Sequence, residues 1–405
     1  MIERRILIAV CGAQLLGMAN YAGFPALLPT FVALWGLSNA QAGWISGIYF
    51  GGYTLAVPVL VSLTDRIDPR CVYLWAMALA AASCIGYALL ADGFWSALVF
   101  RAGAGIGLAG TYMPALKALS DRTPDSARAR VVGYYTTTYS AAASLSFVFI
   151  GLIEEAIGWR WAFGLAGAGA ILAALLVGIV LPPAPPQKAA GSWREALAAL
   201  DFRAVVSNRR ALGFMLAYMA VVWAASANRS WFVALFVFSA SMQEPGAIVW
   251  SATLSAALLN LVSLPANIMG NELAIRLGAP RAIAGLFIAA AVMACVFASS
   301  LDRAYLVVVA VGVLYILVLN ANATSVTAGT VVAAEAERRG ATMALHSCLG
   351  FFGGFLGPLI FGYVLDFGGG SGAMAAWFTA FATLAVVCVL GALSVTTLAR
   401  GARLV

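Results

Sequence analysis

The stretch SLTDRIDPR, residues 62–70, holds four charged side chains within six positions of a chain in which only 10% of residues are charged. A looser version of it, ELAIRLGAPR, returns at residues 272–281. A charged hairpin that recurs in so apolar a chain indicates that one structural unit is present twice.

The composition around these hairpins is that of a membrane protein. The chain has 405 residues, of which 63% are hydrophobic, and its mean hydropathy is +0.96. These values exclude an ordinary soluble fold. A helix needs about 20 mostly apolar residues to cross a bilayer, and such runs follow one another here almost without pause. We therefore expect an all-α polytopic membrane protein.

The charged residues divide the apolar runs into twelve predicted transmembrane spans. The spans lie near residues 6–34, 42–63, 71–91, 96–118, 131–153, 160–181, 211–238, 247–270, 282–300, 305–327, 340–365 and 374–398.

Lysine and arginine predict the orientation of these spans. Of the 23 basic residues, Arg160 and Arg303 fall in the loops of one side, and Arg101 and Arg229 fall within spans. All the others lie on the opposite side, which the positive-inside rule assigns to the cytoplasm. We expect a protein of the cell (inner) membrane with both termini cytoplasmic. Because the basic residues are spread over short loops, they indicate no nucleic-acid surface.

The two hairpins mark an internal repeat. Arg66 aligns with Arg276 at an offset of 210 residues, and SARARVVGYY aligns with AERRGATMAL, which pairs Arg130 with Arg339 at an offset of 209. Two separate places thus give nearly the same period. The expected domains are a six-helix bundle over residues 1–181, a cytoplasmic linker over 182–210 and a second six-helix bundle over 211–405.

Two parallel six-helix repeats and several motifs resemble the major facilitator superfamily. Asp65, Arg66 and Arg70 fit its G-x-x-x-D-R-x-G-x-R-R loop, although Val61 and Asp68 stand where the pattern has glycine. FRAGAGIGLAG at the start of the fourth span is similar to the family's R-x-x-x-G-x-G segment, and GWRWAF (158–163) is also typical of it. The resemblance implies the major facilitator fold and alternating access, but names no substrate.

The same resemblance implies a role for the first hairpin. Asp65 would lie near the N-terminus of the eleventh span and near Arg128 or Arg130, where a carboxylate stabilises a helix N-terminus. The alternative is that these charges only fix the topology. The candidate latch residues are Asp65, Arg66, Arg70, Arg128, Arg130 and Arg276.

Two arginines within spans are the first candidates for substrate contact. Arg101 shares a helical stripe with Gly105, Leu108 and Tyr112 in the fourth span, and Arg229 lies in the seventh. Arginine in hydrocarbon is costly, so each is expected to face a hydrated cavity or a partner. The alternative for each is a guanidinium that snorkels to the membrane surface or bonds to backbone carbonyls.

Every Asp and Glu of the chain falls in a loop or at a span end, so positive groups have no acidic partner at mid-membrane. This favours an anionic substrate. His346, the single histidine, lies about two turns into the eleventh span. It is expected either to couple transport to protons or to pack through hydrogen bonds. The full substrate-site prediction is Arg101, Arg229, Tyr21, Asn20, Tyr112, Tyr139, Asn260, Asn320 and His346.

The sequence thus predicts a secondary transporter for a small anion or weak organic acid. ALSDRTPDSARARVVGYYTTTYS and GNELAIRLG resemble the cyanate- and nitrate-type branch of the superfamily. The alternative is a multidrug or metabolite exporter, against which the missing Gly-Pro signature of the fifth span counts. An enzyme is not expected, because a single histidine permits neither HExxH nor a histidine cluster.

The expected partners are a small-molecule substrate, protons or a counter-substrate, and the lipid bilayer. No cofactor or metal is expected, since the six cysteines lie in or beside apolar spans without CxxC spacing. A monomer is what the family resemblance implies.

Overall fold

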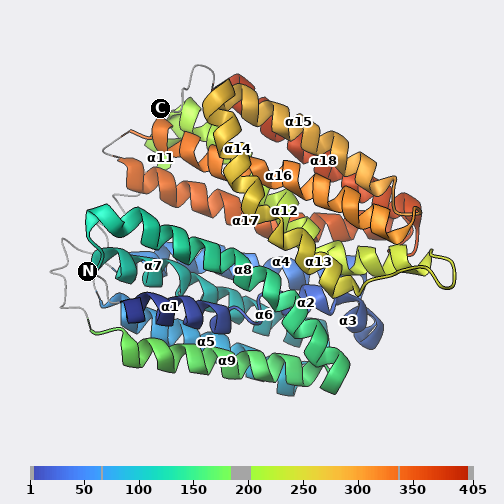
Figure 1. Cartoon of the computed structure of the whole chain (residues 1–405), viewed down its shortest axis with the longest axis horizontal. Coiled ribbons are helices and arrows are strands. Elements are labelled where there is room, and N and C mark those ends of the chain that lie inside the picture. Colours follow the sequence, from blue (N-terminus) through green and yellow to red (C-terminus); the bar gives the residue numbers. More distant parts are fainter. Residues whose placement is uncertain (1–3, 65–66, 184–201, 336–337, 400–405) are drawn as a thin grey trace. The chain divides into compact units, whose positions relative to one another are not determined.

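The computed structural model describes residues 4–64, 67–183, 202–335 and 338–399. Within these ranges every regular element is a helix, joined by turns and loops, and no strand occurs (Figure 1). This confirms the all-α fold class. Nine helical segments of the described ranges are long and apolar enough to cross a membrane. They are Pro69–Leu90, Arg130–Ile157, Trp159–Val180, Arg209–Ser241, Ala252–Leu277, Ala279–Ala298, Tyr305–Ala333, Arg339–Phe367 and Met374–Leu398.

The helices group into two compact units. Unit 1 runs up to Leu27 and resumes at Ile48, while unit 2 contains Leu28–Gly47 together with the C-terminal half of the chain. Unit 1 comprises α1 (Arg4–Gly17), α2 (Gly23–Ala26), α5 (Pro69–Leu90), α6 (Phe94–Ala109), α7 (Tyr112–Asp121), α8 (Asp125–Ile157) and α9 (Trp159–Val180). The helix α4 (Asn39–Leu63) belongs to both units, because it runs through the boundary at Gly47.

Unit 2 also holds the short helix α3 (Leu28–Trp35), which the repeat assigns to the N-terminal bundle. Most of the linker, residues 184–201, lies outside the described residues. The remaining helices are α11 (Phe202–Ser207), α12 (Arg209–Ser241), α13 (Ala252–Leu261), α14 (Ser263–Leu277), α15 (Ala279–Ala298), α16 (Tyr305–Ala333), α17 (Arg339–Phe367) and α18 (Met374–Leu398).

Side chains cap several helices where the sequence places short polar residues before an apolar run. Asp68 accepts a hydrogen bond of 2.9 Å from the backbone N–H of Arg70 and precedes Pro69 at the first position of α5. Asn208 caps α12 in the same way. A capped N-terminus satisfies backbone donors that have no partner within the helix. Asp68, the departure from the family's glycine pattern, therefore has a structural reason.

Three predicted spans are not continuous helices. The first is divided into α1, α2 and α3, the fourth into α6 and α7 with Gly110 and Thr111 between them, and the eighth into α13 and α14 with Val262 between them. Pro114, the third residue of α7, has no N–H to donate to the carbonyl one turn back, which favours a break before it. The stripe expected from Arg101 to Tyr112 is therefore interrupted, although the two residues remain in one unit.

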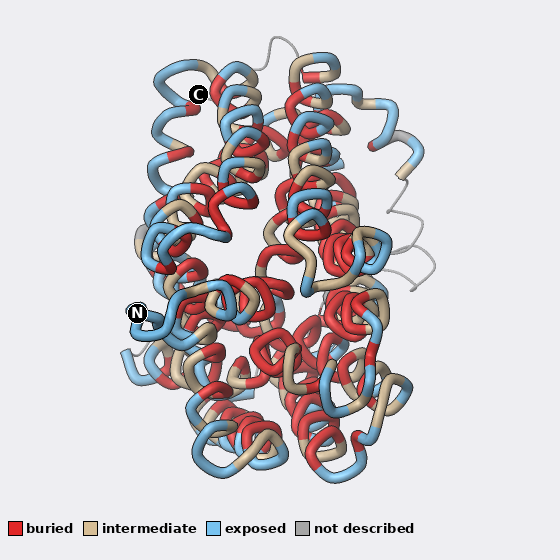
Figure 2. Tube along the Cα trace, turned by 90° about the vertical axis from the view of Figure 1, so that its right-hand side faces the viewer, coloured by how far each residue is buried: buried red, intermediate tan, exposed pale blue. Residues whose placement is uncertain are grey.

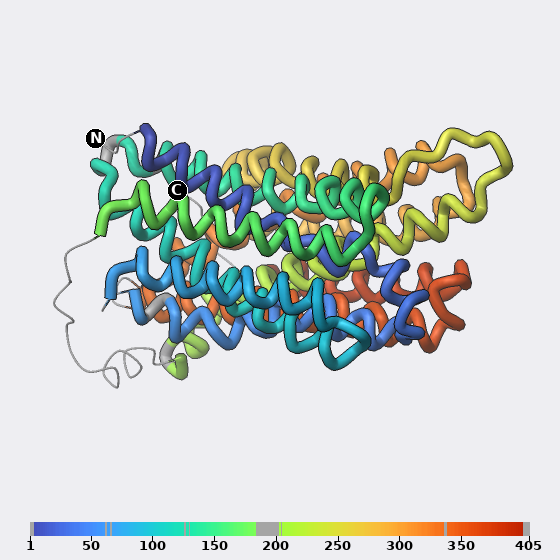
Figure 3. Tube along the Cα trace, turned by 90° about the horizontal axis from the view of Figure 1, so that it is seen from below, coloured from blue at the N-terminus to red at the C-terminus, as the bar shows by residue number. Residues whose placement is uncertain are grey.

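Apolar side chains are buried between helices and also exposed on their outer faces. In unit 1, α1 packs beside α9 (Figure 3), with Val10, Tyr73 and Val177 in one buried cluster. Along the long helices, buried and exposed stretches alternate (Figure 2). Leu55 and Ile179 are about four-fifths exposed, at 80% and 82%. Apolar surface of this kind is stable in contact with lipid chains.

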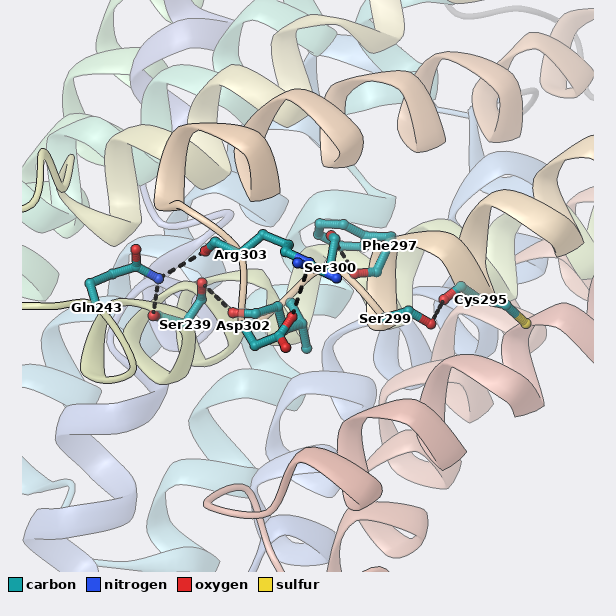
Figure 4. A network of polar contacts seen from close by, with 9 residues as sticks. Ser239, Gln243, Cys295, Phe297, Ser299, Ser300, Asp302 and Arg303 are labelled. Carbon is teal, nitrogen blue, oxygen red and sulfur yellow. Dashed lines mark hydrogen bonds and ion pairs between the residues drawn. The ribbon is translucent and has the colours of Figure 1, made fainter.

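A network of hydrogen bonds fastens the turn between α15 and α16 to the end of α12 (Figure 4). Ser239 donates to the carbonyl of Leu301 at 3.0 Å, and the amide of Gln243 donates to the carbonyls of Ser239 and Arg303, each at 3.0 Å. Side-chain donors thus form hydrogen bonds to backbone carbonyls of the turn and of the end of α12.

Glycine permits the close approach of α4 and α6 within unit 1. A Cβ on Gly105 would overlap the carbonyl oxygen of Tyr49, and one on Gly52 would lie 2.5 Å from the carbonyl oxygen of Ala102. Small residues are what allow two membrane helices to meet backbone to backbone. This contact brings Tyr49 to the level of Arg101.

We expect Gly105→Ala to destabilise the protein by roughly 1–3 kcal/mol, because the new methyl group has to displace the backbone of α4. The measurement is thermal unfolding in detergent micelles. Gly164→Ala, a helical position on α9 where an added Cβ meets nothing within 4 Å, is the matched control and is expected to leave stability unchanged or slightly raised. Equal melting temperatures for the two variants would contradict the packing argument.

Candidate transport site

Arg101 lies deep within unit 1 and is 1% exposed. Its Nη1 donates to the backbone carbonyl of Asn20 at 3.3 Å, and its guanidinium carbon stands 4.3 Å from the centre of the Tyr49 ring. Nε is buried and has no partner. One carbonyl and one ring face are thus the partners of a group that carries a full positive charge.

The break in the first span supplies that carbonyl. Asn20 lies between α1 and α2, and its carbonyl also accepts the N–H of Gly23 at 3.0 Å. In a membrane, irregular backbone is tolerated where buried polar groups or a hydrated cavity take up the freed carbonyls. The buried guanidinium and the broken helix therefore stabilise one another.

A series of aromatic contacts leads from the Tyr49 ring, which covers Arg101, to three further tyrosines. The ring of Tyr21 meets Tyr49 edge-on at a centroid distance of 5.8 Å and Tyr139 at 6.0 Å, while Tyr139 meets Tyr112 at 4.9 Å. The structure thus brings together five of the predicted site residues in unit 1. They are Asn20, Tyr21, Arg101, Tyr112 and Tyr139.

The space in this region is small. A cavity of about 10 Å³ is lined by Asn20, Tyr21, Tyr49 and Cys84, among others. This volume corresponds to about one water molecule. The amide oxygen of Asn20 is buried without a hydrogen-bond partner. This region of unit 1 therefore encloses little space, and the arginine is bonded to a carbonyl, which is the alternative role predicted for it.

The other predicted residues lie in unit 2. Arg229 on α12 donates from Nε to the side-chain oxygen of Asn260 at 3.0 Å, and Asn260 in turn donates to the carbonyl of Ala256 at 2.8 Å. Asn320 donates to the carbonyl of Ile316 on its own helix, α16, at 3.1 Å. Arg229 and Asn260 thus form one polar pair between α12 and α13.

His346 on α17 is 2% exposed and stacks on the ring of Tyr218 at a centroid distance of 3.9 Å. Its Nδ1 lies 3.1 Å from the hydroxyl of Thr330, and its Nε2 lies 3.3 Å from that of Thr327. Each hydroxyl also contacts a carbonyl of α16, at 3.1 and 3.0 Å. These are four contacts, two between a hydroxyl and a ring nitrogen and two between a hydroxyl and a carbonyl. The two hydroxyls and a neutral imidazole supply three protons, so one of the four contacts has no proton for a hydrogen bond.

The structure describes only part of the predicted latch, because Asp65 and Arg66 lie outside the described residues. Arg70 donates to the carbonyl of Gly178 on α9. Arg128 approaches the carbonyl of Thr123, and Arg276 pairs with Glu272 at 2.8 Å on the exposed face of α14. Arg130 is exposed on α8.

Sequence reasoning left Tyr218, Thr327 and Thr330 out of the site, although all three contact His346. The spacing of the two threonines, one helical turn apart, is a signal for a shared face. It is weak, because threonines in membrane helices also bond to their own helix. Within the described ranges, no three His, Cys, Asp or Glu side chains come together as a metal site would need.

A larger cavity, of about 700 Å³, lies between α15 and α18 of unit 2 and opens at the surface. Its lining is almost wholly apolar and includes Ile288, Val292 and Phe378, each between 44% and 59% exposed. None of the predicted site residues lines it.

The membrane-length helices and the buried arginine fit a helical membrane transporter. The profile of the Major Facilitator Superfamily matches residues 10–336. The chain therefore belongs to the major facilitator superfamily, whose members are transporters and not enzymes. It is a multi-pass membrane protein of that type.

Two relatives match about a third of the chain. A probable sphingolipid transporter, spinster homolog 1 of Arabidopsis thaliana, is 28% identical over 147 residues, which are 36% of this chain and 30% of that protein. An uncharacterized transporter of Enterobacter sp. (strain 638) is 31% identical over 152 residues, which are 36% of this chain and 38% of that protein. The chain thus spans well under half the length of these relatives.

Solved structures share the whole fold. A bacterial homologue of the human lysosomal transporter Spinster, in an inward-facing and unoccupied conformation, has a TM-score of 0.74 at 17% identity and covers 98% of this chain and 96% of that one. A variant of the nucleoside transporter NupG has a TM-score of 0.77 at 13% identity and covers 97% and 99%. At these identities the likeness shows the fold alone. The predicted cyanate- and nitrate-type branch is not supported by these matches.

Proposed function

We propose that the protein is a secondary transporter that moves an organic anion across the cell membrane by alternating access between two six-helix repeats. The observation that carries this proposal is Arg101, a buried cation that forms no ion pair within the described part of the chain. A guanidinium cannot lose its charge at any accessible pH, so a negatively charged substrate is the partner that it lacks.

The surroundings of Arg101 favour an organic anion over a small inorganic one. A carboxylate can accept two parallel hydrogen bonds from a guanidinium, and the unpartnered Nε is one available donor. The tyrosine rings around it offer an apolar surface for the rest of the molecule. A weak organic acid combines both features.

Substrate entry requires the closed site to open. Ligand sites enclose roughly 300–1,000 Å³, whereas the cavity lined by Asn20 and Tyr49, the two residues that contact Arg101, measures about 10 Å³. Because Tyr21 and Tyr49 line that cavity, they are the side chains that have to move first. Arg229 and Asn260 of the second unit are proposed to contact the substrate in the open state.

Coupling to protons or to a counter-substrate belongs to the same proposal. His346 is the residue proposed to bind the coupling proton. A protonated imidazole adds the fourth proton, so that all four contacts among His346, Thr327, Thr330 and the carbonyls of α16 become hydrogen bonds.

The alternative is an exporter of drugs or amphiphilic metabolites. The observation in its favour is the sequence match to a probable sphingolipid transporter. A thermal-shift screen of the purified protein against carboxylic acids, inorganic anions, nucleosides, lysophospholipids and lipophilic cations separates the two, because a ligand that binds the folded state raises its melting temperature. Stabilisation by lipophilic cations alone would overturn the anion proposal.

We expect Arg101→Lys to weaken binding of the stabilising organic anion at least tenfold, about 1.4 kcal/mol, because an ammonium cannot make two parallel hydrogen bonds. Arg101→Ala is expected to abolish binding. Isothermal calorimetry measures both. Arg160→Lys is the matched control, since Arg160 likewise donates to a carbonyl, that of Ala88 at 2.8 Å, and lies over the ring of Trp159 at 4.5 Å. Unchanged affinity in Arg101→Ala would give this residue a purely structural role.

We expect Asp65→Asn to slow transport while folding and membrane insertion stay intact, because the proposed cytoplasmic latch needs a charged carboxylate. Uptake into proteoliposomes, normalised to inserted protein, is the measurement. Asp121→Asn, which removes an exposed carboxylate paired with Lys117 at 3.7 Å, serves as the control. Wild-type rates in Asp65→Asn would leave the hairpin with a topological role only.

A further inference from the structure

Asp366, near the C-terminal end of α17, binds the first residues of a helix 326 to 327 positions away in the sequence. Its Oδ1 accepts the backbone N–H of Asn39 at 3.1 Å and the side-chain amide of the same residue at 2.8 Å. Its Oδ2 accepts the N–H of Ala40 at 2.8 Å. One carboxylate thus closes the N-terminus of α4 with three hydrogen bonds, all within unit 2.

The sequence of α4 already provides a cap of its own. The hydroxyl of Ser38 accepts the N–H of Gln41 at 3.1 Å, and the side chain of Gln41 accepts the N–H of Ser38 at 3.0 Å. This is the reciprocal pair of a capping box. The helix therefore stays capped if Asp366 withdraws, and water can replace the carboxylate at the remaining donors. The hydrogen bonds of Asp366 to the start of α4 can therefore break and re-form while the helix end stays capped.

The packing beneath this contact consists of backbone against backbone. A Cβ on Gly43 would lie 2.5 Å from the carbonyl oxygen of Pro358, and one on Gly47 would overlap the carbonyl oxygen of Phe355. Gly43 and Gly47 are four residues apart and thus share one face of α4. Smooth surfaces of this kind separate without the rearrangement that interlocked large side chains would need.

The contact between Asp366 and α4 lies on the part of α4 that belongs to unit 2. Residues up to Gly47 of α4 belong to unit 2, and from Ile48 onward the same helix belongs to unit 1. The part in unit 1 packs on α6 through Gly52 and Gly105. The segment Leu28–Gly47 thus packs within unit 2, while the chain on both sides of it belongs to unit 1.

We propose that Asp366 is a gating residue, whose carboxylate holds the start of α4 against α17 and keeps closed the end of the bundle that the positive-inside pattern assigns to the outside. This inference rests on the alternating access of the proposed function. When the carboxylate releases Asn39 and Ala40, the segment Leu28–Gly47 leaves α17 and the outer side opens. The residue acts on the conformation and does not contact the substrate.

The experiment measures the conformation directly. Spin labels are placed at Ala33 on α3 and at Ala304 before α16, both exposed, in a variant whose six free cysteines are replaced by alanine. Electron–electron double resonance then gives the distribution of distances between the two labels in lipid nanodiscs. Asp366→Asn keeps the shape of the side chain and removes its charge, which weakens the bonds to the backbone donors.

We expect Asp366→Asn to raise the ratio of long to short distances about tenfold. Asp366→Glu is expected to return the distribution toward that of the parent, because it restores the charge. Glu244→Gln, which removes an exposed carboxylate from the loop after α12, is expected to change nothing. Melting temperatures of all variants establish that each is folded.

A distribution in Asp366→Asn identical to that of the parent would overturn the proposal, and so would an equal shift in Glu244→Gln. The outcome is independent of the substrate. If the distances shift as expected while no organic anion binds, the gate stands and the anion proposal falls. If anions bind through Arg101 while the distances stay unchanged, the gate falls and the anion proposal stands.

Discussion

A guanidinium that is 1% exposed in a membrane-embedded bundle constrains everything around it. Its charge is permanent, so the helices near Arg101 have to supply electron-rich groups without leaving other polar atoms in lipid. The broken first span supplies a carbonyl at Asn20, and α4 supplies the ring of Tyr49. Both contacts need helices that approach more closely than ordinary side chains allow, which is why Gly105 lies against the backbone of Tyr49.

Sequence reasoning could predict the helices but not the places where they break. Nine of the expected spans have a counterpart among the membrane-length helices, because the length and hydropathy of an apolar run can be read from the sequence alone. The divisions at Gly110 and after Gly17 depend on which carbonyls find partners elsewhere in the fold, such as that of Asn20. Proline signals such a break only weakly, since α4 and α17 continue through Pro58 and Pro358.

The candidate site shows the same limit. Residue type alone made Arg101, Asn20 and the tyrosines candidates, because polar groups are conspicuous in an apolar span. It could not identify their partners, since the contact of His346 with Tyr218 joins helices far apart in the sequence. Asp366 was placed correctly at a span end, yet its role depends on the start of α4, more than 300 residues earlier in the chain.

The helix α4 links the gate to the site through its own rigidity. Gly47 packs on α17 in unit 2, and Tyr49, two residues later, covers Arg101 in unit 1. An α-helix rises about 1.5 Å per residue, so these two contacts lie within one turn of each other. A movement that lifts the start of α4 from α17 therefore also shifts the ring over the guanidinium. In the proposed mechanism, opening at the outer side and exposure of the charge follow from one displacement, and an anion that binds Arg101 favours the open arrangement by the same coupling.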